Sequence, residues 1–257
     1  MMETKIGLQL YSIRSELERD FFGSLEKVKA AGYDCVEFAG YGGYSAKKLK
    51  NELERIGLLP YSSHVGADLL ENHLDDVVSF SRELGLSWVI CPGYPIRCKE
   101  DCKKISDILV RAAQALEPWG IQVGYHNHHH EFIQFDGVYA LNLILQNSAG
   151  VRIVAEVDTC WAQYADVDPV AYIDSLKDLA GPLHFKDINA NYKELEGSDI
   201  NVEVGNGIID FPSIIAVARK NGILERGLIV EQEAFTRDPF ESIKISYENI
   251  RHMLAES

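Results

Sequence analysis

The chain has 257 residues, of which 46% are hydrophobic and 25% charged, and its formal net charge is −14. These values are ordinary for a globular protein, and the length suits an α/β barrel that folds as a single domain over residues 1–257. Binding to a phosphate backbone depends on Lys and Arg, so the acidic balance argues against a nucleic-acid partner. No apolar run approaches the roughly 18 residues that a membrane-spanning helix needs, so no membrane partner is expected either.

Five cysteines are present, and they form no paired spacing. No signal peptide is expected at the opening Met-Met-Glu-Thr-Lys. Both features predict reduced thiols and a cytoplasmic location. Cys98 and Cys102 would lie one turn apart on a helix and, without a second pair, are interpreted as surface thiols and not as a metal site. Cys91 and Cys160 are interpreted as packing residues.

Short hydrophobic segments alternate with helical patterns along the whole chain. The first segment, Lys5–Tyr11, alternates apolar residues, and the helical pattern after it stops at Gly32, a common residue just past a helix end. The predicted strands lie within residues 5–11, 35–39, 59–65, 88–92, 121–128, 151–161, 181–187 and 227–233. The predicted helices are residues 21–31, 46–56, 71–84, 101–119, 138–146, 168–179, 211–221 and 238–254.

Eight strand-then-helix units with short buried strands predict a closed (β/α)8 TIM barrel. An open doubly wound sheet would carry a glycine-rich dinucleotide loop after its first strand, and Gln9–Arg14 has no such pattern. No linker or compositional break divides the chain, so one domain is the economical interpretation.

Ionisable and metal-binding side chains gather where the predicted strands end, which is where such barrels place their working sites. They are Glu37, His64, His126, His128, Glu156, Asp158, His184, Lys186, Glu231 and Glu233. Alternate residues of a strand share a face, so Glu156 and Asp158 point the same way. Because neighbouring strand ends lie close together, Asp158, His184 and Glu231 are predicted to share one divalent cation. Carboxylate and imidazole ligands suit Mn2+, Mg2+, Co2+ or Zn2+, of which Mn2+ is favoured.

Several of these residues have a second interpretation. Glu37 is either a substrate contact or a salt-bridged barrel carboxylate, and His64 is either a substrate contact or a satisfied core histidine. His126 is expected as a ligand or near-ligand, although some imidazoles of the run His126–His130 can be plain loop polar groups. Glu233, one pleat beyond the predicted ligand Glu231, is interpreted as a solvated loop carboxylate.

Five motifs carry a family resemblance that spans nearly the whole chain. They are Tyr125-His-Asn-His128, Glu156-Val-Asp-Thr-Cys-Trp-Ala-Gln163, Leu183-His-Phe-Lys-Asp187, Val204-Gly-Asn-Gly-Ile-Ile-Asp-Phe-Pro212, and Ile229-Val-Glu-Gln-Glu233 with Ser246-Tyr-Glu-Asn249. With them the chain resembles the sugar phosphate isomerase/epimerase family of xylose-isomerase-like barrels.

The resemblance implies one divalent cation held by Glu, Asp, His and Glu from strands five to eight. Asp158, His184 and Glu231 match the last three ligands, whereas His126 stands where the family has its strand-five Glu. Either His126 takes over the ligand role, which gives the set His126, Asp158, His184 and Glu231, or Glu156 supplies the missing negative charge.

The implied activity is that of a metal-dependent sugar isomerase or epimerase, which moves a proton next to a carbonyl through a metal-stabilised enediolate. Glu231, Glu156 and Lys186 are the expected catalytic residues. The expected substrate-binding residues are Glu37, His64, His128 and Trp161. The substrate would be a sugar or cyclitol, and because barrels of this family often pair, a homo-oligomer is a possible state.

Three alternatives stay open. The histidine-rich fifth strand also suits a lyase or dehydratase acting on an inosose or a 3-keto-glycoside. A non-catalytic sugar-binding barrel is a second alternative. An AP endonuclease is a third, although Trp161 and Cys91 stand where that enzyme needs histidines. The loop Gly205-Asn-Gly207 is either a phosphate cradle or a tight bend.

Overall fold

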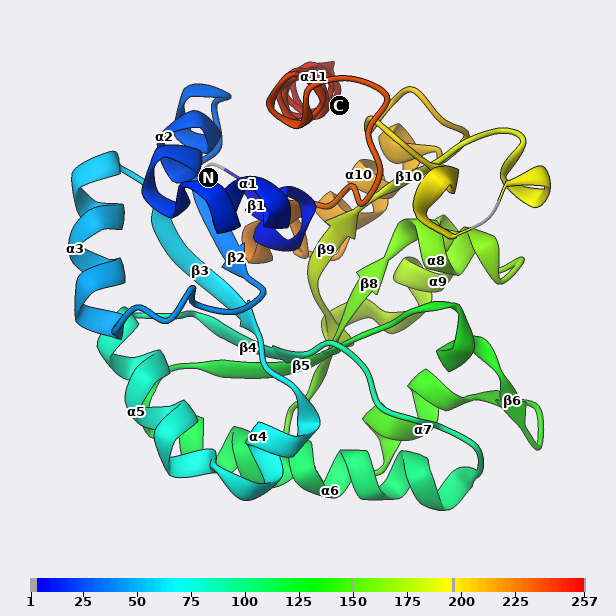
Figure 1. Ribbon diagram of the computed structural model, residues 1–257. Coiled ribbons are helices and arrows are strands. Elements are labelled where there is room, and N and C mark those ends of the chain that lie inside the picture. The colour runs from blue at the N-terminus through cyan, green and yellow to red at the C-terminus, as the bar shows by residue number, and fades with distance from the viewer. Residues whose placement is uncertain (1–3, 149, 196, 257) are drawn as a thin grey trace.

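The computed structural model describes residues 4–148, 150–195 and 197–256. Parallel strands form a closed barrel in the order β1-β12-β9-β8-β5-β4-β3-β2, and the helices lie outside it (Figure 1). The barrel strands are β1 (Ile6–Gln9), β2 (Cys35–Phe38), β3 (Leu59–His64), β4 (Trp88–Cys91), β5 (Gln122–His126), β8 (Val154–Asp158), β9 (Ala180–Phe185) and β12 (Leu228–Val230). The predicted (β/α)8 barrel is confirmed. The opening Met1 to Glu3, which belong to the segment predicted to lack a signal peptide, lie outside the described residues.

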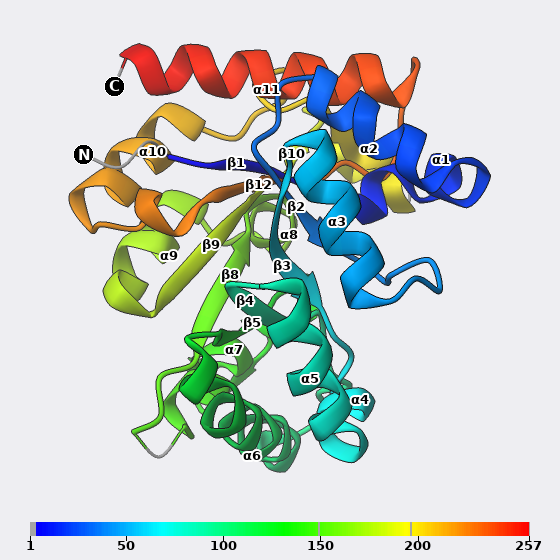
Figure 2. The ribbon, with the colours of Figure 1, turned by 90° about the vertical axis from the view of Figure 1, so that its left-hand side faces the viewer.

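Local sequence signals account for most helix boundaries. The carboxylate of Asp20 and the hydroxyl of Ser45 accept backbone N–H groups at the starts of α2 and α3, and Gly57 ends α3 in a left-handed conformation (φ 82°). The helices are α1 (Arg14–Arg19), α2 (Phe21–Ala30), α3 (Ala46–Ile56), α4 (Ala67–Asn72), α5 (Leu74–Leu84), α6 (Lys99–Leu116), α7 (Ala140–Gln146), α8 (Thr159–Tyr164), α9 (Pro169–Leu176), α10 (Phe211–Lys220) and α11 (Pro239–Glu256). In Figure 2, α11 runs beside α2 and α10. In the described part of the chain, none of these helices is long and apolar enough to cross a membrane.

The structure differs from the predicted elements in several places. The helices α1 and α8 were not expected, and residues 159–161, predicted within a strand, begin α8. The helix predicted at 71–84 is two helices, α4 and α5, broken at His73 (φ −134°, ψ 34°). Two short hairpins, β6–β7 (Gln134–Phe135 and Val138–Tyr139) and β10–β11 (Asp187–Ile188 and Asn201–Val202), were not expected. The interpretation of Cys102 as a surface thiol is wrong, because Cys102 lies on the buried face of α6. Its neighbour Cys98 is exposed as expected.

An apolar plug fills the barrel below the polar strand ends. Its buried members are Cys35, Tyr61, Trp88, Ile90, Val154 and Ile229. Since alternate strand residues share a face, Glu37 lies one pleat above Cys35, Glu156 above Val154, and Glu231 above Ile229. The plug therefore closes the barrel from one end and leaves the polar residues at the other.

The loop at Gly205–Gly207 closes around a carboxylate of the protein itself. Oδ2 of Asp187 accepts the backbone N–H groups of Gly205 (2.9 Å) and Gly207 (2.8 Å). Oδ1 accepts those of Ile188 (2.8 Å) and Ile209 (3.2 Å). These N–H groups already bind a carboxylate of the protein. Of the two interpretations of this loop, the structure therefore supports the tight bend and not the phosphate cradle.

Substitution of Gly207 tests this packing. A Cβ at Gly207 would lie 2.3 Å from Oδ1 of Asp187 and 2.3 Å from the carbonyl oxygen of Ile188. Gly207→Ala should therefore lower the free energy of unfolding by about 1–3 kcal/mol in urea denaturation. The control is Gly66→Ala, where nothing lies within 4 Å of an added Cβ and a change below about 0.5 kcal/mol is expected. Equal effects of the two substitutions would contradict the account.

Candidate metal centre

Strand register brings the predicted ligands together. Asp158 at the end of β8 pairs with His184 of β9, and Ile229 of β12, two residues before Glu231, also pairs with His184. On the other side, His126 of β5 pairs with Glu156 of β8. His126, Asp158, His184 and Glu231 each offer a ligand atom, and these atoms lie within 4.8 Å of one another. They are the four residues that the sequence singled out, and their role as ligands remains a prediction.

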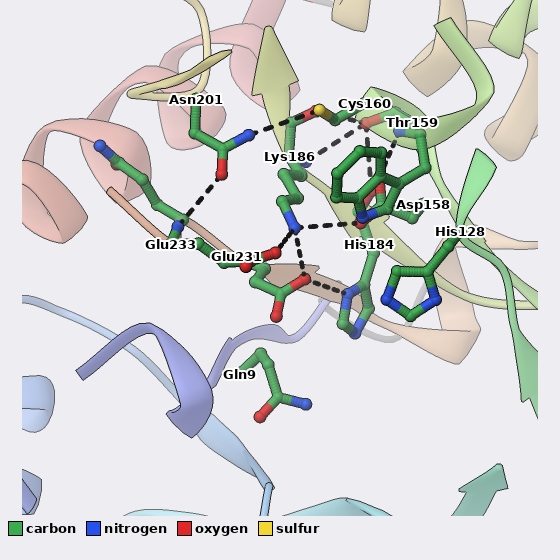
Figure 3. A network of polar contacts seen from close by, with 12 residues as sticks. Gln9, His128, Asp158, Thr159, Cys160, His184, Lys186, Asn201, Glu231 and Glu233 are labelled. Carbon is green, nitrogen blue, oxygen red and sulfur yellow. Dashed lines mark hydrogen bonds and ion pairs between the residues drawn. The ribbon is translucent and has the colours of Figure 1, made fainter. Parts of the chain in front are cut away.

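Two of these ligand atoms are buried and make no hydrogen bond in the described part of the chain: Oδ2 of Asp158, which lies 3.9 Å from Nζ of Lys186, and Nδ1 of His184, which lies 3.4 Å from Oε2 of Glu231. Asp158 begins α8, and its Oδ1 accepts the Trp161 backbone N–H at 2.9 Å, which fixes the direction of the carboxylate (Figure 3). Leaving a buried carboxylate oxygen and an imidazole nitrogen unsatisfied costs free energy. A cation bound between them would satisfy both, so the donor set fits a metal.

Two further carboxylates support the histidine rings from inside the barrel. Oε1 of Glu37 lies 2.6 Å from Nε2 of His184 and accepts a hydrogen bond of 2.7 Å from the Gln9 amide. Oε2 of Glu156 lies 3.2 Å from Nδ1 of His126 and 3.2 Å from Nε2 of His184. A carboxylate on one ring nitrogen orients an imidazole and raises its basicity toward a metal on the other nitrogen.

A second group could also hold an ion. His64, His126, Glu156 and His184 offer ligand atoms within the same 4.8 Å limit. Their atoms already contact one another: Nε2 of His64 lies 2.9 Å from Oε2 of Glu156, the same oxygen that faces His126 and His184. In this inner group each imidazole faces a carboxylate oxygen, although Oε1 of Glu156 makes no hydrogen bond in the described part of the chain. The outer group, which consists of His126, Asp158, His184 and Glu231, contains two such atoms, Oδ2 of Asp158 and Nδ1 of His184.

Lys186 neutralises part of the cluster. Its fully buried ammonium lies 3.2 Å from Oε2 of Glu231 and 3.9 Å from Oδ2 of Asp158, and it is 5.0 Å from the ring centre of Trp161. It also pairs with Oε1 of Glu233 (Figure 3). The interpretation of Glu233 as a solvated loop carboxylate is therefore wrong. Only 21% of its side chain is exposed.

The cluster carries more negative charge than its one permanent cation balances. Glu37, Glu156, Asp158, Glu231 and Glu233 face Lys186 and the histidines. Burial raises the pKa of Asp158 to about 7, and Lys186 offsets this only in part. Burial, together with the charge of Glu37, raises the pKa of Glu156 to about 7. A divalent cation bound here would take the place of the protons on these carboxylates and on His184 as the balancing positive charge.

The histidines divide into two kinds. Burial opposes protonation of His184, but the carboxylates of Glu156 and Glu37 outweigh it, so the pKa of His184 lies well above its usual value. Burial and the neighbouring His184 and His64 hold the pKa of His126 well below the usual range. His126 is therefore neutral, which is the form of imidazole that binds metals.

A cavity of about 400 Å³ opens over the cluster. Its lining residues are Tyr11, Ala39, His64, Pro92, His126, His128, Glu231 and Glu233. Of the predicted substrate contacts, His64 and His128 line this cavity. Glu37 is fully buried beneath it and Trp161 is partly buried beside Lys186, so neither is in the wall. For Glu37 the geometry favours the salt-bridged alternative.

Sequence reasoning missed several supporting residues. Gln9 bonds Glu37, and Oδ1 of Asn127 accepts the backbone N–H of Asp158 at 3.2 Å. Glu131 is fully buried and accepts hydrogen bonds from the His128 backbone N–H (2.8 Å) and the Tyr125 hydroxyl (2.7 Å). The only available signal was the three-residue spacing of His128 and Glu131, which is typical of a capping box.

Known proteins share this architecture over the whole chain. The family described as xylose isomerase-like TIM barrel matches residues 25–255. The chain belongs to this family. A sugar phosphate isomerase/epimerase from Parabacteroides distasonis ATCC 8503 is 27% identical over 99% of this chain and 95% of its own, with a TM-score of 0.84. This xylose isomerase-like barrel has no match among curated proteins.

Two more distant structures show the same fold. An L-ribulose 3-epimerase is 15% identical over 99% of this chain and 95% of its own, with a TM-score of 0.75. A protein named IOLI, whose structure contains a zinc atom, is 15% identical over 98% of both chains, with a TM-score of 0.73. The predicted resemblance to sugar phosphate isomerases and epimerases is confirmed at the level of the family.

The raised pKa values predict how the metal-free protein responds to pH. The folded state keeps protons on Asp158 and Glu156 up to about pH 7, whereas the unfolded chain releases them near pH 4. His126 opposes this effect below about pH 6.5, where only the unfolded chain protonates it. The free energy of unfolding should therefore fall as pH rises above about 6.5. The raised pKa of His64, about 10, acts in the same direction, because its contribution is lost as pH rises toward that value.

Urea denaturation of EDTA-treated protein at pH 5 to 9 checks this expectation. Asp158→Asn keeps a side chain that can begin α8 and removes the titrating carboxyl, so it should flatten the pH dependence and stabilise the metal-free protein at pH 8 by about 1–4 kcal/mol. Metal-free protein that is more stable at about pH 9 than at about pH 6.5 would contradict the assignment.

Proposed function

We propose that this protein is a divalent-metal-dependent enzyme that moves a proton next to the carbonyl of a sugar or cyclitol, as an isomerase or epimerase. The observation that carries the proposal is the outer group, in which His126, Asp158, His184 and Glu231 converge and two of their buried atoms make no hydrogen bond in the described part of the chain. Similarity to a sugar phosphate isomerase/epimerase supports the reaction class.

The proposed cofactor is one divalent cation held by His126, Asp158, His184 and Glu231. The set has two imidazoles and two carboxylates, which suits Mn2+ best and also Mg2+, Co2+ or Zn2+. When bound, the cation would act as a Lewis acid that polarises the carbonyl and makes the neighbouring C–H more acidic.

The ionisable residues of the cavity lie on two opposite walls. Glu231 and Glu233 follow β12, while His64 and His126 end β3 and β5, which flank the strand opposite. We assign proton acceptance to Glu231, because Lys186 and His184 outweigh its burial and hold its pKa below the usual range, so that it is ionised.

Lys186, an expected catalytic residue, is assigned an electrostatic role and not a proton transfer. Although it is fully buried, the carboxylates of Glu231 and Asp158 raise its pKa above its ordinary value. It therefore remains an ammonium that orients Glu231 and Glu233 and stabilises negative charge. Glu156 is out of the cavity and contacts three imidazoles, so we assign it, with Glu37, to positioning the metal ligands.

A lyase or dehydratase is the second candidate. The wall across from Glu231 consists of the imidazoles of His64, His126 and His128 and has no carboxylate. An imidazole there could give a proton to a departing oxygen after Glu231 has taken one from carbon. The same cavity thus supports elimination from an inosose or a 3-keto-glycoside.

Metal analysis tests the cofactor. We expect one divalent cation per chain after incubation with Mn2+ and gel filtration, measured by inductively coupled plasma mass spectrometry. Asp158→Asn should abolish binding, and Glu37→Gln should weaken it about 10–100-fold because His184 loses its orienting partner. The control Glu83→Gln changes an exposed carboxylate on α5 and should leave binding unchanged. Stoichiometric binding by Asp158→Asn would refute the assigned ligands.

Exchange with solvent tests the reaction. Keto-sugars and inososes are incubated with the Mn2+-loaded protein in deuterated water and followed by NMR and mass spectrometry. One deuterium beside the carbonyl without loss of mass identifies an isomerase or epimerase, whereas loss of water or an aglycone identifies a lyase. Glu231→Gln should slow either reaction by at least about 100-fold, and Glu83→Gln should not. If the metal-loaded protein exchanges no proton of any substrate, the proposed function fails.

A further inference from the structure

A second recess adjoins the metal cavity. It has a volume of about 370 Å³, and most of its wall is apolar. Its lining residues are Gly40, Tyr41, His64, Val65, Leu69, His73, Asp76, Val77 and Phe80. We call it the apolar recess. No part of the proton-transfer chemistry uses it, and a volume of this size is typical of small-molecule sites.

The break between α4 and α5 forms two sides of the recess. Leu69 comes from α4 and Val77 and Phe80 from α5, which follows the turn at His73 (Figure 2). The ring of Tyr41 lies over Phe80 with centroids 4.2 Å apart, and its hydroxyl donates to Oγ of Ser63 at 2.8 Å. This hydrogen bond fixes an aromatic surface in the wall.

The recess borders the metal cavity. His64 lines both, and the adjacent residues Ala39 and Gly40 line the cavity and the recess respectively. Nε2 of His64 faces Glu156 at 2.9 Å, so its ring separates the metal cluster from the apolar wall. A molecule bound at the cluster could therefore extend past His64 into the recess.

The residues that line the apolar recess indicate which kind of chemical group can bind there. The side chain of Asp76 is 91% exposed at the rim, and none of the lining residues is Lys or Arg. The two lining histidines already face carboxylates, His64 that of Glu156 at 2.9 Å and His73 that of Asp76 at 4.0 Å, so neither is free to pair with a phosphate. A free sugar would leave Leu69, which is 48% exposed, in contact with water or hydroxyl groups. An aromatic ring would cover Leu69 and Val77 and lie beside Tyr41 and Phe80.

We propose that the apolar recess binds the aromatic aglycone of a glycoside whose sugar ring occupies the metal cavity. The inference rests on the proposed function for the placement of the sugar ring and adds the substrate class, a sugar that bears an aryl group. The recess then contributes binding energy at a distance from the reacting carbon, which an enzyme can use to position the ring over the metal.

Binding of two glycosides to the Zn2+-loaded protein tests the inference. The probes are 4-nitrophenyl β-D-glucopyranoside and methyl β-D-glucopyranoside, followed by NMR of protein labelled at the Leu and Val methyl groups. We expect the aryl glycoside to bind at least tenfold more tightly and to shift the methyl signals of Leu69, Val65 and Val77. The methyl glycoside should leave these three signals unchanged.

A matched pair of leucines provides the control. Leu69→Asp should remove the tenfold preference for the aryl glycoside, because it places a charge in the recess. Leu59 at the start of β3 is 47% exposed and lies outside the recess, so Leu59→Asp should keep the preference. Both leucines are exposed, so neither substitution should prevent folding. Unchanged methyl signals of the other Leu and Val residues would verify that each variant is folded.

Three results would overturn the inference: equal affinity for the two glycosides, an aryl preference that survives Leu69→Asp, or Leu69 signals that change with protein concentration in the absence of glycoside. The last would place a second copy of the chain in the recess. A different result separates the two proposals. If the aryl glycoside binds at Leu69 but the protein binds no metal and exchanges no protons, the proposed function is refuted, whereas the assignment of the recess to an aromatic group stands.

Discussion

Buried negative charge is the constraint on which the site depends. Three carboxylates, those of Glu37, Glu156 and Asp158, are fully buried within the barrel, and Glu231 is nearly so. Lys186 is the one permanent cation among them. Charges at this depth are stable only when they are paired, protonated or bound to a metal, and an unpaired one would cost several kcal/mol. The raised pKa values of Asp158 and Glu156 express that cost in the metal-free protein.

The fold supplies this constraint through the strand register and the apolar plug. The plug residues Val154 and Ile229 lie one pleat below Glu156 and Glu231. They fill the barrel interior there, so the polar side chains lie only at the carboxyl ends of the strands. Pairing of Asp158 with His184 places their side chains side by side. Just beyond the end of β9, Asp187 binds four backbone N–H groups, which anchors the loop after Lys186.

Sequence reasoning identified the barrel and singled out the four residues of the outer group, whose convergence follows from the order of the strands. Strand alternation is enough to put Asp158 and His184 at adjacent strand ends. It could not locate Glu233, whose partner Lys186 is distant in the sequence, or the full burial of Glu37, which depends on contacts with Gln9 and His184 from other strands. The break at His73 was missed because residues 71–84 keep a helical apolar pattern across it. Only the assembled barrel shows that the break borders a recess.

Together these features describe a barrel with buried carboxylates beside a cavity, and we propose that they bind one cation between Asp158 and His184. Anomalous X-ray diffraction at the manganese absorption edge, from crystals grown with Mn2+, tests this claim most directly. The account predicts one peak about 2.0–2.3 Å from Oδ2 of Asp158 and Nδ1 of His184. A peak between His64 and Glu156, or no peak in the barrel, would contradict it.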